Sequence, residues 1–384
     1  MIKAVKVRLY PNSVQKQRIA SQIGGARYVY NRTLALRKYA YTKFGIKVGK
    51  FALTNHIKKL KSREQTAWLK EIDSQAIQQS IANMDKAYQH FFKGGGYPKF
   101  KSRHHSKQSY QYPQRVKMNG NKIYLPKVGW VKMRGWRKEF EGKIKTVTVS
   151  YEAYQYHASV LIDIEEHKKE PCKNINKTIG IDVGISLIVA DSNGNKIKPL
   201  NLERELSRLR LRAKEFSRKK KGSSNRAKAK ARLAKVNLKI ANKRKDFLHK
   251  LSLQYAENQG IVVIEDLKIK NMIRSTKGTK ETPGKKVKQK KGLNRSITQQ
   301  SWGLFFQFLE YKLHERGGHL IKVDPKHTSQ TCYRCGHISK ENRKVQSKFE
   351  CISCGHSDNA DINGAKNILA RGVHGNNASL KIAV

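Results

Sequence analysis

Four of the chain's five cysteines occur as two close pairs, and this pattern constrains the C-terminal fold more than any other feature. The pairs are Cys332-x2-Cys335 and Cys351-x2-Cys354, with fifteen residues between them. Two thiolate pairs at this spacing are typical of a zinc ribbon, in which four sulfurs surround one tetrahedral Zn²⁺ ion. One pair alone could be a redox dithiol, but two pairs favour metal binding. Because the protein would fill all four positions around the ion, we expect this zinc to be structural.

The balance of charge indicates a polyanionic partner. The chain has 81 Lys and Arg residues against 28 Asp and Glu, a formal net charge of +53 over 384 residues. Like charges at this density oppose compaction unless a polyanion neutralises them. Nucleic acid fits best, because each neutralised phosphate releases a counterion and a long contact can use tens of basic residues. Salt-tolerant surfaces are usually acidic, and no amphipathic membrane anchor is visible, so both of these explanations are less favoured.

The sequence also indicates the cellular compartment of the protein. No apolar run approaches the roughly 18–20 residues that a membrane-spanning helix needs. The first residues, MIKAVKVRLYPN, alternate like a strand and lack the apolar region of a signal peptide. Paired cysteines suit metal binding in a reducing compartment. We therefore expect a cytoplasmic protein and no membrane partner.

The first 170 residues change their hydrophobic period twice. Residues 2–9 alternate as a strand does, and helical spacing follows at about 13–44, 50–62 and 74–93. From residue 121 the period returns to two, in the runs NKIYLP, GWVKMRG, IKTVTVS and YHASVLIDI. Together with the first strand, these runs predict a small β-barrel that contains a helical insertion.

The second half of the chain has the pattern of an α/β domain. Strands are predicted in KTIGIDVGISLIVADSNGNKIKP, in GIVVIEDL and in HLIKVDP, with a basic helical hairpin at 201–258 and a helix at about 298–316. Strands separated by helices in this way indicate a mixed sheet. Residues 274–294 are basic, of low complexity and punctuated by glycine, which predicts a mobile loop.

Three acidic residues occupy unusual positions in this basic chain. Asp182 lies inside the apolar strand IGIDVGI, and Glu265 ends the apolar run IVVIE, where an ionised carboxylate must be paired or bind a cation. For each acid taken singly, a salt bridge to one of the many cations is the competing explanation. Together with Asp361, however, they form a set of carboxylates on separate elements, which is the kind of set that holds Mg²⁺ or Mn²⁺. Two such ions can promote phosphodiester hydrolysis.

Several motifs resemble those of a known family. IGIDVG, IVVIEDL, CYRCG, CISCG and DINGAKNI follow one another in the second half, and VRLYPN, ARYVYNRTL, GYPKFKSR, LPKVGWVKMRG and NKRKDFLHKLS lie upstream of or between them. On these motifs the chain resembles the TnpB family of transposon-encoded proteins, over nearly its whole length to about residue 371. These proteins have a RuvC-like nuclease domain of the ribonuclease H type and are related to the type V CRISPR effectors.

The resemblance implies a multidomain α+β fold: a small β-barrel with a helical insertion, then a RuvC-like α/β domain carrying an inserted four-cysteine zinc ribbon. It implies Asp182, Glu265 and Asp361 as catalytic acids that hold two Mg²⁺ ions, with Asp358 as a local turn or cap residue and Asn363 and Asn367 helping to fix the last helix. The domains expected are the first barrel strand at 1–12, the helical insertion at 13–104, the rest of the barrel at 105–170, the nuclease domain at 173–327, the zinc ribbon at 328–358, a final nuclease segment at 359–372 and a disordered tail at 373–384.

The resemblance also implies an activity. The protein is expected to be an RNA-guided DNA endonuclease of a transposable element, which cleaves double-stranded DNA matched by a transposon-end guide RNA next to a short flanking motif. The cut would be a magnesium-dependent hydrolysis by in-line attack of water, with no covalent enzyme intermediate. Its partners would be the guide RNA and the target DNA, and a monomer is expected, with a dimer left open.

Two alternatives remain at this stage. A transposase that catalyses strand transfer shares the fold and the three acids, although the motif order and the inserted zinc ribbon favour the nuclease. A catalytically inactive, guide-dependent DNA-binding regulator could use the same scaffold, but loss of an acid would indicate it, and all three positions are filled.

Candidate nucleic-acid contacts are less specific. Gln78 matches a family position that faces DNA bases, although a hydrated surface amide is an equal alternative. Aromatic residues such as Tyr110 could stack on unpaired bases, or pack in the core. Basic candidates lie in the YPKFKSR loop and at the turn of the helical hairpin: Lys99, Lys101, Arg103, Lys219, Lys220 and Lys221. The loop at 274–294 is either a lid over the active site or a disordered insertion.

Overall fold

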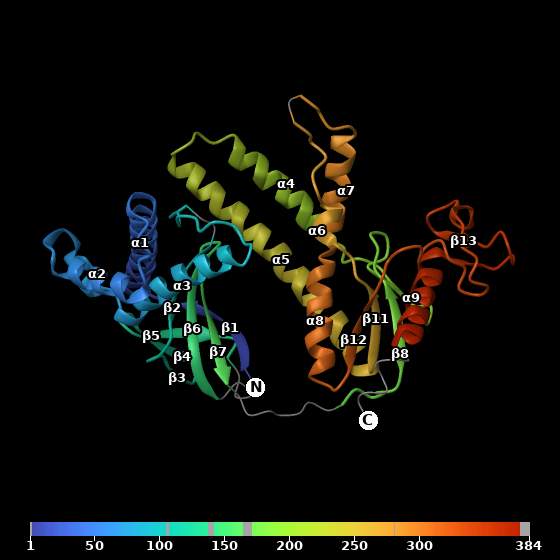
Figure 1. Ribbon diagram of the computed structural model, residues 1–384, viewed down its shortest axis with the longest axis horizontal. Helices are drawn as coiled ribbons and strands as arrows, with labels where there is room; N and C mark the ends of the chain where they lie inside the picture. Colours follow the sequence, from blue (N-terminus) through green and yellow to red (C-terminus); the bar gives the residue numbers. More distant parts are fainter. Residues whose placement is uncertain (1, 105–106, 137–141, 164–170, 280, 377–384) are drawn as a thin grey trace. The chain divides into compact units, whose positions relative to one another are not determined.

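The computed structural model describes residues 2–104, 107–136, 142–163, 171–279 and 281–376, shown in Figure 1. The chain forms two compact units. The first comprises Met1–Glu166 with Arg212–Lys235, and the second comprises His167–Leu211 with Val236–Val384. The sequence also predicts a linker at residues 166–178, and part of it lies outside the described residues. No helix among the described residues is long and apolar enough to cross a membrane.

The first unit contains a seven-stranded antiparallel sheet with the order β2-β6-β7-β1-β5-β4-β3. Its strands are β1 (Ile2–Tyr10), β2 (Lys107–Tyr112), β3 (Lys117–Asn119), β4 (Lys122–Leu125), β5 (Gly129–Arg134), β6 (Lys143–Glu152) and β7 (Gln155–Asp163). The first strand lies centrally, and Val5 and Val7 pair with Val160 and Ala158 to place small apolar side chains in the core. Among the described residues no pairing joins β2 to β3, so the predicted closed barrel is not confirmed.

Three helices of the first unit lie where the 3.6-residue period predicts them. They are α1 (Ser13–Phe44), α2 (Lys50–Ser62) and α3 (Ser74–Phe92), with a 3₁₀ helix, η1, at Glu64–Glu71. Asn12 and Gln15 form a reciprocal capping box that begins α1, and the Asp73 carboxylate accepts from Gln75 N and Ala76 N to begin α3. The apolar faces of these helices form their own core.

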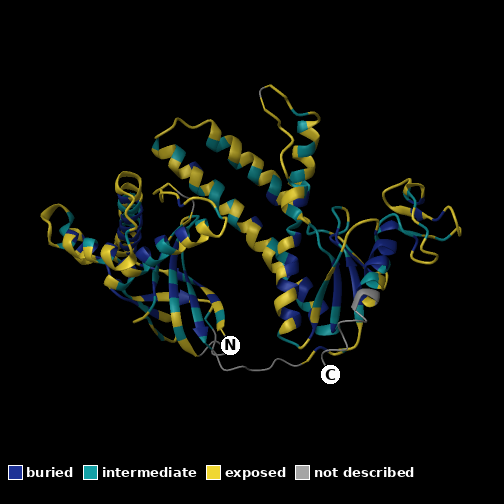
Figure 2. Cartoon of the chain, viewed as in Figure 1, coloured by how far each residue is buried: buried dark blue, intermediate teal, exposed yellow. Residues whose placement is uncertain are grey.

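A mixed five-stranded sheet, with the order β10-β9-β8-β11-β12, organises the second unit. Its strands are β8 (Thr178–Asp182), β9 (Val189–Asp191), β10 (Lys196–Ile197), β11 (Ile261–Glu265) and β12 (His319–Val323). β8, β11 and β12 are parallel, whereas β9 runs antiparallel to both of its neighbours, so the predicted mixed sheet is confirmed. Strands β8, β9 and β11 are largely buried, whereas the edge strands β10 and β12 are exposed or half-buried (Figure 2).

Helix α9 (Ala360–Asn376) packs against this sheet. Gly180 in β8 permits the contact, because a Cβ atom at this position would lie 2.2 Å from the Ala365 carbonyl oxygen. The helix continues beyond residue 372, where a disordered tail was predicted to begin, and residues 377–384 lie outside the described part of the chain.

The remaining helices of the second half are α4 (Glu203–Ser217), α5 (Ser224–Asn258), α6 (Ile269–Met272), α7 (Val287–Gln300) and α8 (Trp302–His314). The first two form the predicted basic hairpin. The mobile loop predicted at 274–294 is helical from Val287, so its second part was predicted wrongly. Tertiary contacts hold this helix, because Lys290 Nζ donates to the Met272 carbonyl at 2.7 Å and Asn294 Nδ2 donates to the Ile273 carbonyl at 2.8 Å.

Candidate functional site

Two of the three predicted acids end neighbouring parallel strands. Asp182 is the last residue of β8, and Glu265 is the last residue of β11. Ile181 and Ile264 are partners in the β8–β11 register, so the residues that follow them leave the sheet side by side at its carboxyl edge. In open α/β sheets this edge is where ligands bind.

Helix α9 brings the third acid to the same edge. Asp361 lies in the first turn of the helix, which Asn359 caps by accepting from Asp361 N at 3.2 Å and Ile362 N at 3.3 Å. One turn later, a Cβ atom at Gly364 would lie 3.1 Å from Asp182 Oδ2, so the helix backbone passes close to the Asp182 carboxylate.

The electrostatics of Asp182 show that the three acids interact. Although part of the residue reaches solvent, its carboxyl group is enclosed, and this burial together with the charges of Glu265 and Asp361 raises its pKa from 3.8 to about 7. Arg343 opposes the shift. Burial also raises the pKa of Glu265, opposed by a hydrogen bond from the Thr328 hydroxyl and by the positive charge of Arg371.

Arg343 is the direct basic partner of this cluster. Its guanidinium lies 3.1 Å from Asp361 Oδ1 and also donates to the Gln346 carbonyl. The arginine ends the 3₁₀ helix η3 (Lys340–Arg343). Among the described residues, neither Asp182 nor Glu265 has a salt bridge. A salt bridge to a basic residue was the competing explanation for these two acids, and the described residues do not provide one. Neither Arg343 nor Thr328 was predicted, because one arginine or threonine gives no signal in a chain of this composition.

Carboxylate oxygens are the ligands that magnesium prefers, so the donor set fits that ion. The three carboxylates are nevertheless more widely spaced than the cysteine sulfurs. Among the described residues, only the four cysteines form a set of three or more metal-type ligands whose atoms all lie within 4.8 Å of one another.

The four cysteine sulfurs converge as the spacing predicts. Cys332 Sγ lies 3.7 Å from Cys354 Sγ, and Cys335 Sγ lies 3.6 Å from Cys351 Sγ. A tetrahedral zinc ion with Zn–S bonds of about 2.3 Å separates its sulfurs by roughly 3.8 Å, so the geometry fits Zn²⁺. The segment otherwise has little core: Phe349 and Ala360 are the buried apolar residues clustered with Cys332 and Cys351, and β13 (Lys348–Glu350) pairs with β14 (Ser357–Asn359).

Two buried asparagines connect this cysteine segment to α9. Asn363 donates to the Thr331 carbonyl at 2.8 Å and accepts from Tyr333 N at 3.1 Å. Asn367 donates to the Thr328 carbonyl at 2.9 Å and to the Thr331 carbonyl at 2.6 Å. The prediction that both asparagines help to fix the helix is confirmed. Asp358 was predicted to be a local turn or cap residue. It does not cap the helix, because Asn359 does, but its carboxylate makes local contacts: it accepts from Asn359 N at 2.7 Å and from Lys366 Nζ at 2.7 Å.

Comparison with known proteins agrees with this arrangement. Residues 302–368 match a domain described as "Cas12f1-like, TNB domain", residues 159–276 match "Probable transposase" of IS605 OrfB, and residues 1–46 match its "Helix-turn-helix domain". InsQ of Escherichia coli (strain K12), named as an RNA-guided DNA endonuclease, is 38% identical over 97% of this chain and 92% of its own length. A protein of Streptomyces pristinaespiralis with the same kind of name is 32% identical over 97% and 89%.

The chain belongs to the TnpB (IS605 OrfB) family. Its fold resembles that of Cas12f1 in a complex with single guide RNA and target DNA, with a TM-score of 0.54 at 15% identity over 96% of this chain and 98% of the other. At that identity the likeness concerns the fold alone. A multidomain α+β architecture related to Cas12f is therefore established.

The candidate nucleic-acid contacts have mixed outcomes. Of the two interpretations of Tyr110, packing in the core is confirmed and base stacking is wrong, because its side chain is only 3% exposed and packs against Tyr112. The other candidates lie on exposed parts of α3, of the loop after it and of the α4–α5 turn, where their roles remain predictions: Gln78, Lys99, Lys101, Arg103, Lys219, Lys220 and Lys221.

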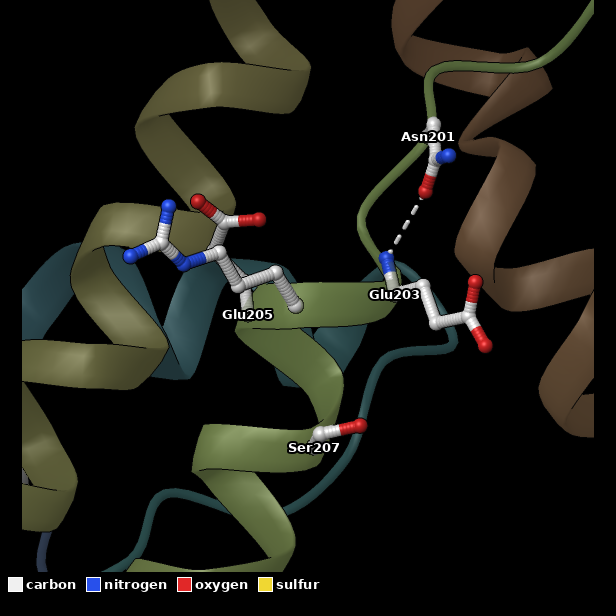
Figure 3. Close-up of a pocket in the computed structure, with 5 residues that line it drawn as sticks. Asn201, Glu203, Glu205 and Ser207 are labelled. Atoms are coloured by element: carbon white, nitrogen blue, oxygen red, sulfur yellow. Dashed lines mark hydrogen bonds between the residues drawn. The ribbon is translucent and has the colours of Figure 1, made fainter.

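A separate open hollow of about 580 Å³ lies at the start of α4, away from the three acids in sequence (Figure 3). It is lined by Asn201, Glu203, Arg204, Glu205 and Ser207. Asn201 Oδ1 accepts from Glu203 N at 3.0 Å, and the Glu205 carboxylate is already paired with Lys243. These contacts explain the residues structurally, and we assign the hollow no catalytic role.

The raised pKa of Asp182 predicts a pH-dependent stability in metal-free solution. Because its folded-state pKa is about 7 and its ordinary value is 3.8, folding favours the protonated form. That contribution to stability is complete below about pH 3.8 and is lost as the pH rises to about 7. The difference between the two values corresponds to roughly 4 kcal/mol of unfolding free energy.

Urea unfolding of the native protein and of Asp182→Asn, both zinc-loaded and in buffer without added Mg²⁺, measures this effect. Since Asn cannot ionise, the variant should gain stability relative to the native protein as the pH rises between the two values, and added Mg²⁺ should reduce the gain. A difference between the two proteins that stays constant with pH would contradict the prediction.

Proposed function

We propose that this chain is an RNA-guided DNA endonuclease that hydrolyses phosphodiester bonds at the carboxyl edge of the second unit's sheet. The observation that carries the proposal is the convergence of Asp182, Glu265 and Asp361 from three separate elements, with neither Asp182 nor Glu265 in a salt bridge among the described residues. Such a cluster is unfavourable for folding unless cations compensate it, so a structural role does not account for it. The names of the TnpB relatives support the same activity.

The three carboxylates are the residues that would hold two Mg²⁺ ions. When bound, these ions would activate water and stabilise the leaving oxygen of the cleaved strand. The protein's own residues have distinct tasks. Thr328 orients the Glu265 carboxylate, Arg343 screens Asp361, and the zinc segment holds α9 so that Asp361 stays at the sheet edge. In this proposal the zinc ion is a structural brace outside the chemistry.

Sequence selection is assigned to base pairing. We infer that a guide RNA transcribed from the transposon end pairs with one DNA strand, while the protein reads a short flanking motif and the shape of the duplexes. A net charge of +53 supports this division, because contacts to phosphates need no particular base sequence.

The test is to express the chain together with transposon-end RNA, to sequence the RNA that copurifies, and to offer plasmids with matched and unmatched targets in the presence of Mg²⁺. We expect one defined transcript and cleavage of the matched plasmid alone. Binding of the matched plasmid without cleavage would instead indicate a regulator. Joined DNA strands without a defined transcript would indicate a strand-transfer transposase.

A further inference from the structure

A small pocket in the first unit gathers positive charge from three separate elements. Its volume is about 160 Å³, several times the roughly 30 Å³ that a water molecule occupies in the liquid. Its basic side chains are Arg27 from α1, Lys101 from the loop after α3, and Lys107 from β2. Other lining residues are Ile23, Ser102, Gln108 and Ser109, so hydroxyl and amide groups are present and no carboxylate is.

Neutral partners, not acids, hold Arg27 and Lys101 in place. Arg27 donates to Gln108 Oε1 at 3.0 Å, and Gln108 Nε2 donates to the Arg103 carbonyl at 2.7 Å. Asn31 fixes the backbone of Lys101 through two hydrogen bonds of 2.8 and 2.9 Å. The Lys101 ammonium then lies 4.1 Å from the centre of the Tyr30 ring.

The charge of the pocket is not compensated within the described residues. None of its three cations lies within 4.0 Å of a carboxylate, whereas Arg37, further along α1, contacts Asp85 at 2.6 Å. Glu152 stands opposite Lys107 in the β2–β6 register, but its carboxylate lies 3.9 Å from Lys6 Nζ. Packing of the ammonium lowers the pKa of Lys101, which agrees with partial desolvation without a counterion.

We propose that this pocket binds one phosphodiester group of a nucleic-acid strand, an inference that rests on the proposed function. Arg27 supplies a planar fork of donors and Lys107 a mobile charge, and the Ser102 and Ser109 hydroxyls offer further donors to phosphate oxygens. A planar carboxylate would use the arginine fork but leave the remaining donors of the pocket unmatched. The phosphate belongs either to the guide RNA or to the target DNA, and both share this chemistry.

The experiment compares how nucleic-acid binding depends on salt concentration in a pocket variant and in a control variant of the full-length protein. Both also carry Asp182→Asn and are kept free of Mg²⁺, so that no cleavage occurs. The test variant is Arg27→Gln with Lys107→Gln. The matched control is Lys122→Gln with Lys132→Gln, two exposed cations paired in the β4–β5 register of the same sheet and lining no described pocket. The probes are a single-stranded transposon-end RNA, offered to RNA-free protein, and a matched DNA duplex, offered to the ribonucleoprotein. Circular dichroism confirms that each variant is folded.

We expect the pocket variant to bind one probe about tenfold more weakly, and the dependence of log K on log salt to become shallower by about 0.7 for RNA or 0.9 for duplex DNA. The probe affected identifies the source of the phosphate. Unchanged slopes for both probes, or an equal loss in the control, would overturn the inference and leave the proposed function intact. Failure of the parent protein to bind RNA at all would overturn both.

Discussion

Asp182→Asn will abolish DNA cleavage, with a loss on the order of 10³-fold or more, or about 4 kcal/mol of transition-state stabilisation. The substitution keeps the shape of the side chain but removes the charge that interacts with both Glu265 and Asp361. An amide is a poorer ligand for Mg²⁺ than a carboxylate, so the cluster loses the site that its geometry supports. The measurement is cleavage of a matched plasmid by the purified ribonucleoprotein.

This loss should occur without loss of folding or of target binding. Because Asp182 is strained by its neighbours' charges when it is ionised, the neutral variant should be at least as stable as the native protein at neutral pH. Asp266→Asn is the matched control, since that aspartate lies next to Glu265 in sequence but faces Lys268. Undiminished cleavage by Asp182→Asn, or an equal loss in the control, would refute the assignment of the acids.

Loss of zinc will have the second large effect. In Cys351→Ser we expect the segment at 328–358 to unfold and cleavage to fall as far as it does in the acid variants. The reason is that the segment has almost no apolar core of its own, while structural zinc contributes roughly 10–16 kcal/mol of apparent binding energy in zinc-finger peptides. Without the segment, Asn363 and Asn367 lose their partners and Asp361 loses Arg343.

Metal content and limited proteolysis measure this outcome together. The native chain should hold one zinc ion and resist cleavage between residues 328 and 358, and the variant should fail on both counts while the five-stranded sheet remains folded. Cys172→Ser is the control, because that cysteine is buried away from the cluster and should leave the zinc content unchanged. A Cys351→Ser protein that retains zinc and full activity would show that the ion is not the brace proposed here.

The magnesium site proposed above would also account for an acidic centre in a protein of such high positive charge. In most of the described salt bridges an exposed lysine or arginine faces a single carboxylate, and such pairs contribute little. At the sheet edge, by contrast, Arg343 faces a cluster of three acids. The remaining negative charge favours binding of divalent cations in a protein whose surface otherwise attracts phosphates.

Features with a local physical cause could be predicted from the sequence. The cysteine pairs predict the sulfur cluster, because tetrahedral thiolate ligation requires only knuckles of that length. Helices α1, α2 and α3 follow their apolar period, and Asp182 and Glu265 are exceptional because they interrupt or end apolar strands. For the same reason, their convergence could be expected once both strands were placed in one parallel sheet.

Other features depend on residues that meet only in the folded chain, and these were missed or predicted wrongly. Arg343 and Thr328 reach the acids because the zinc segment folds back onto α9, and Tyr110 is buried because β2 pairs with β6 over the core of the first sheet. Periodicity likewise could not show whether the first sheet closes, since closure depends on the pairing of its edge strands.

The order of the residues was enough to identify which groups can bind a metal or a phosphate, because the chemistry of a side chain is local. Only the folded chain shows which of those groups are neutralised, as Asp358 is by Lys366, and which face one another without a salt bridge, as Asp182 and Glu265 do among the described residues. The physical reason is that electrostatic interactions depend on distances in space, and those distances are set by the packing of elements far apart in the sequence.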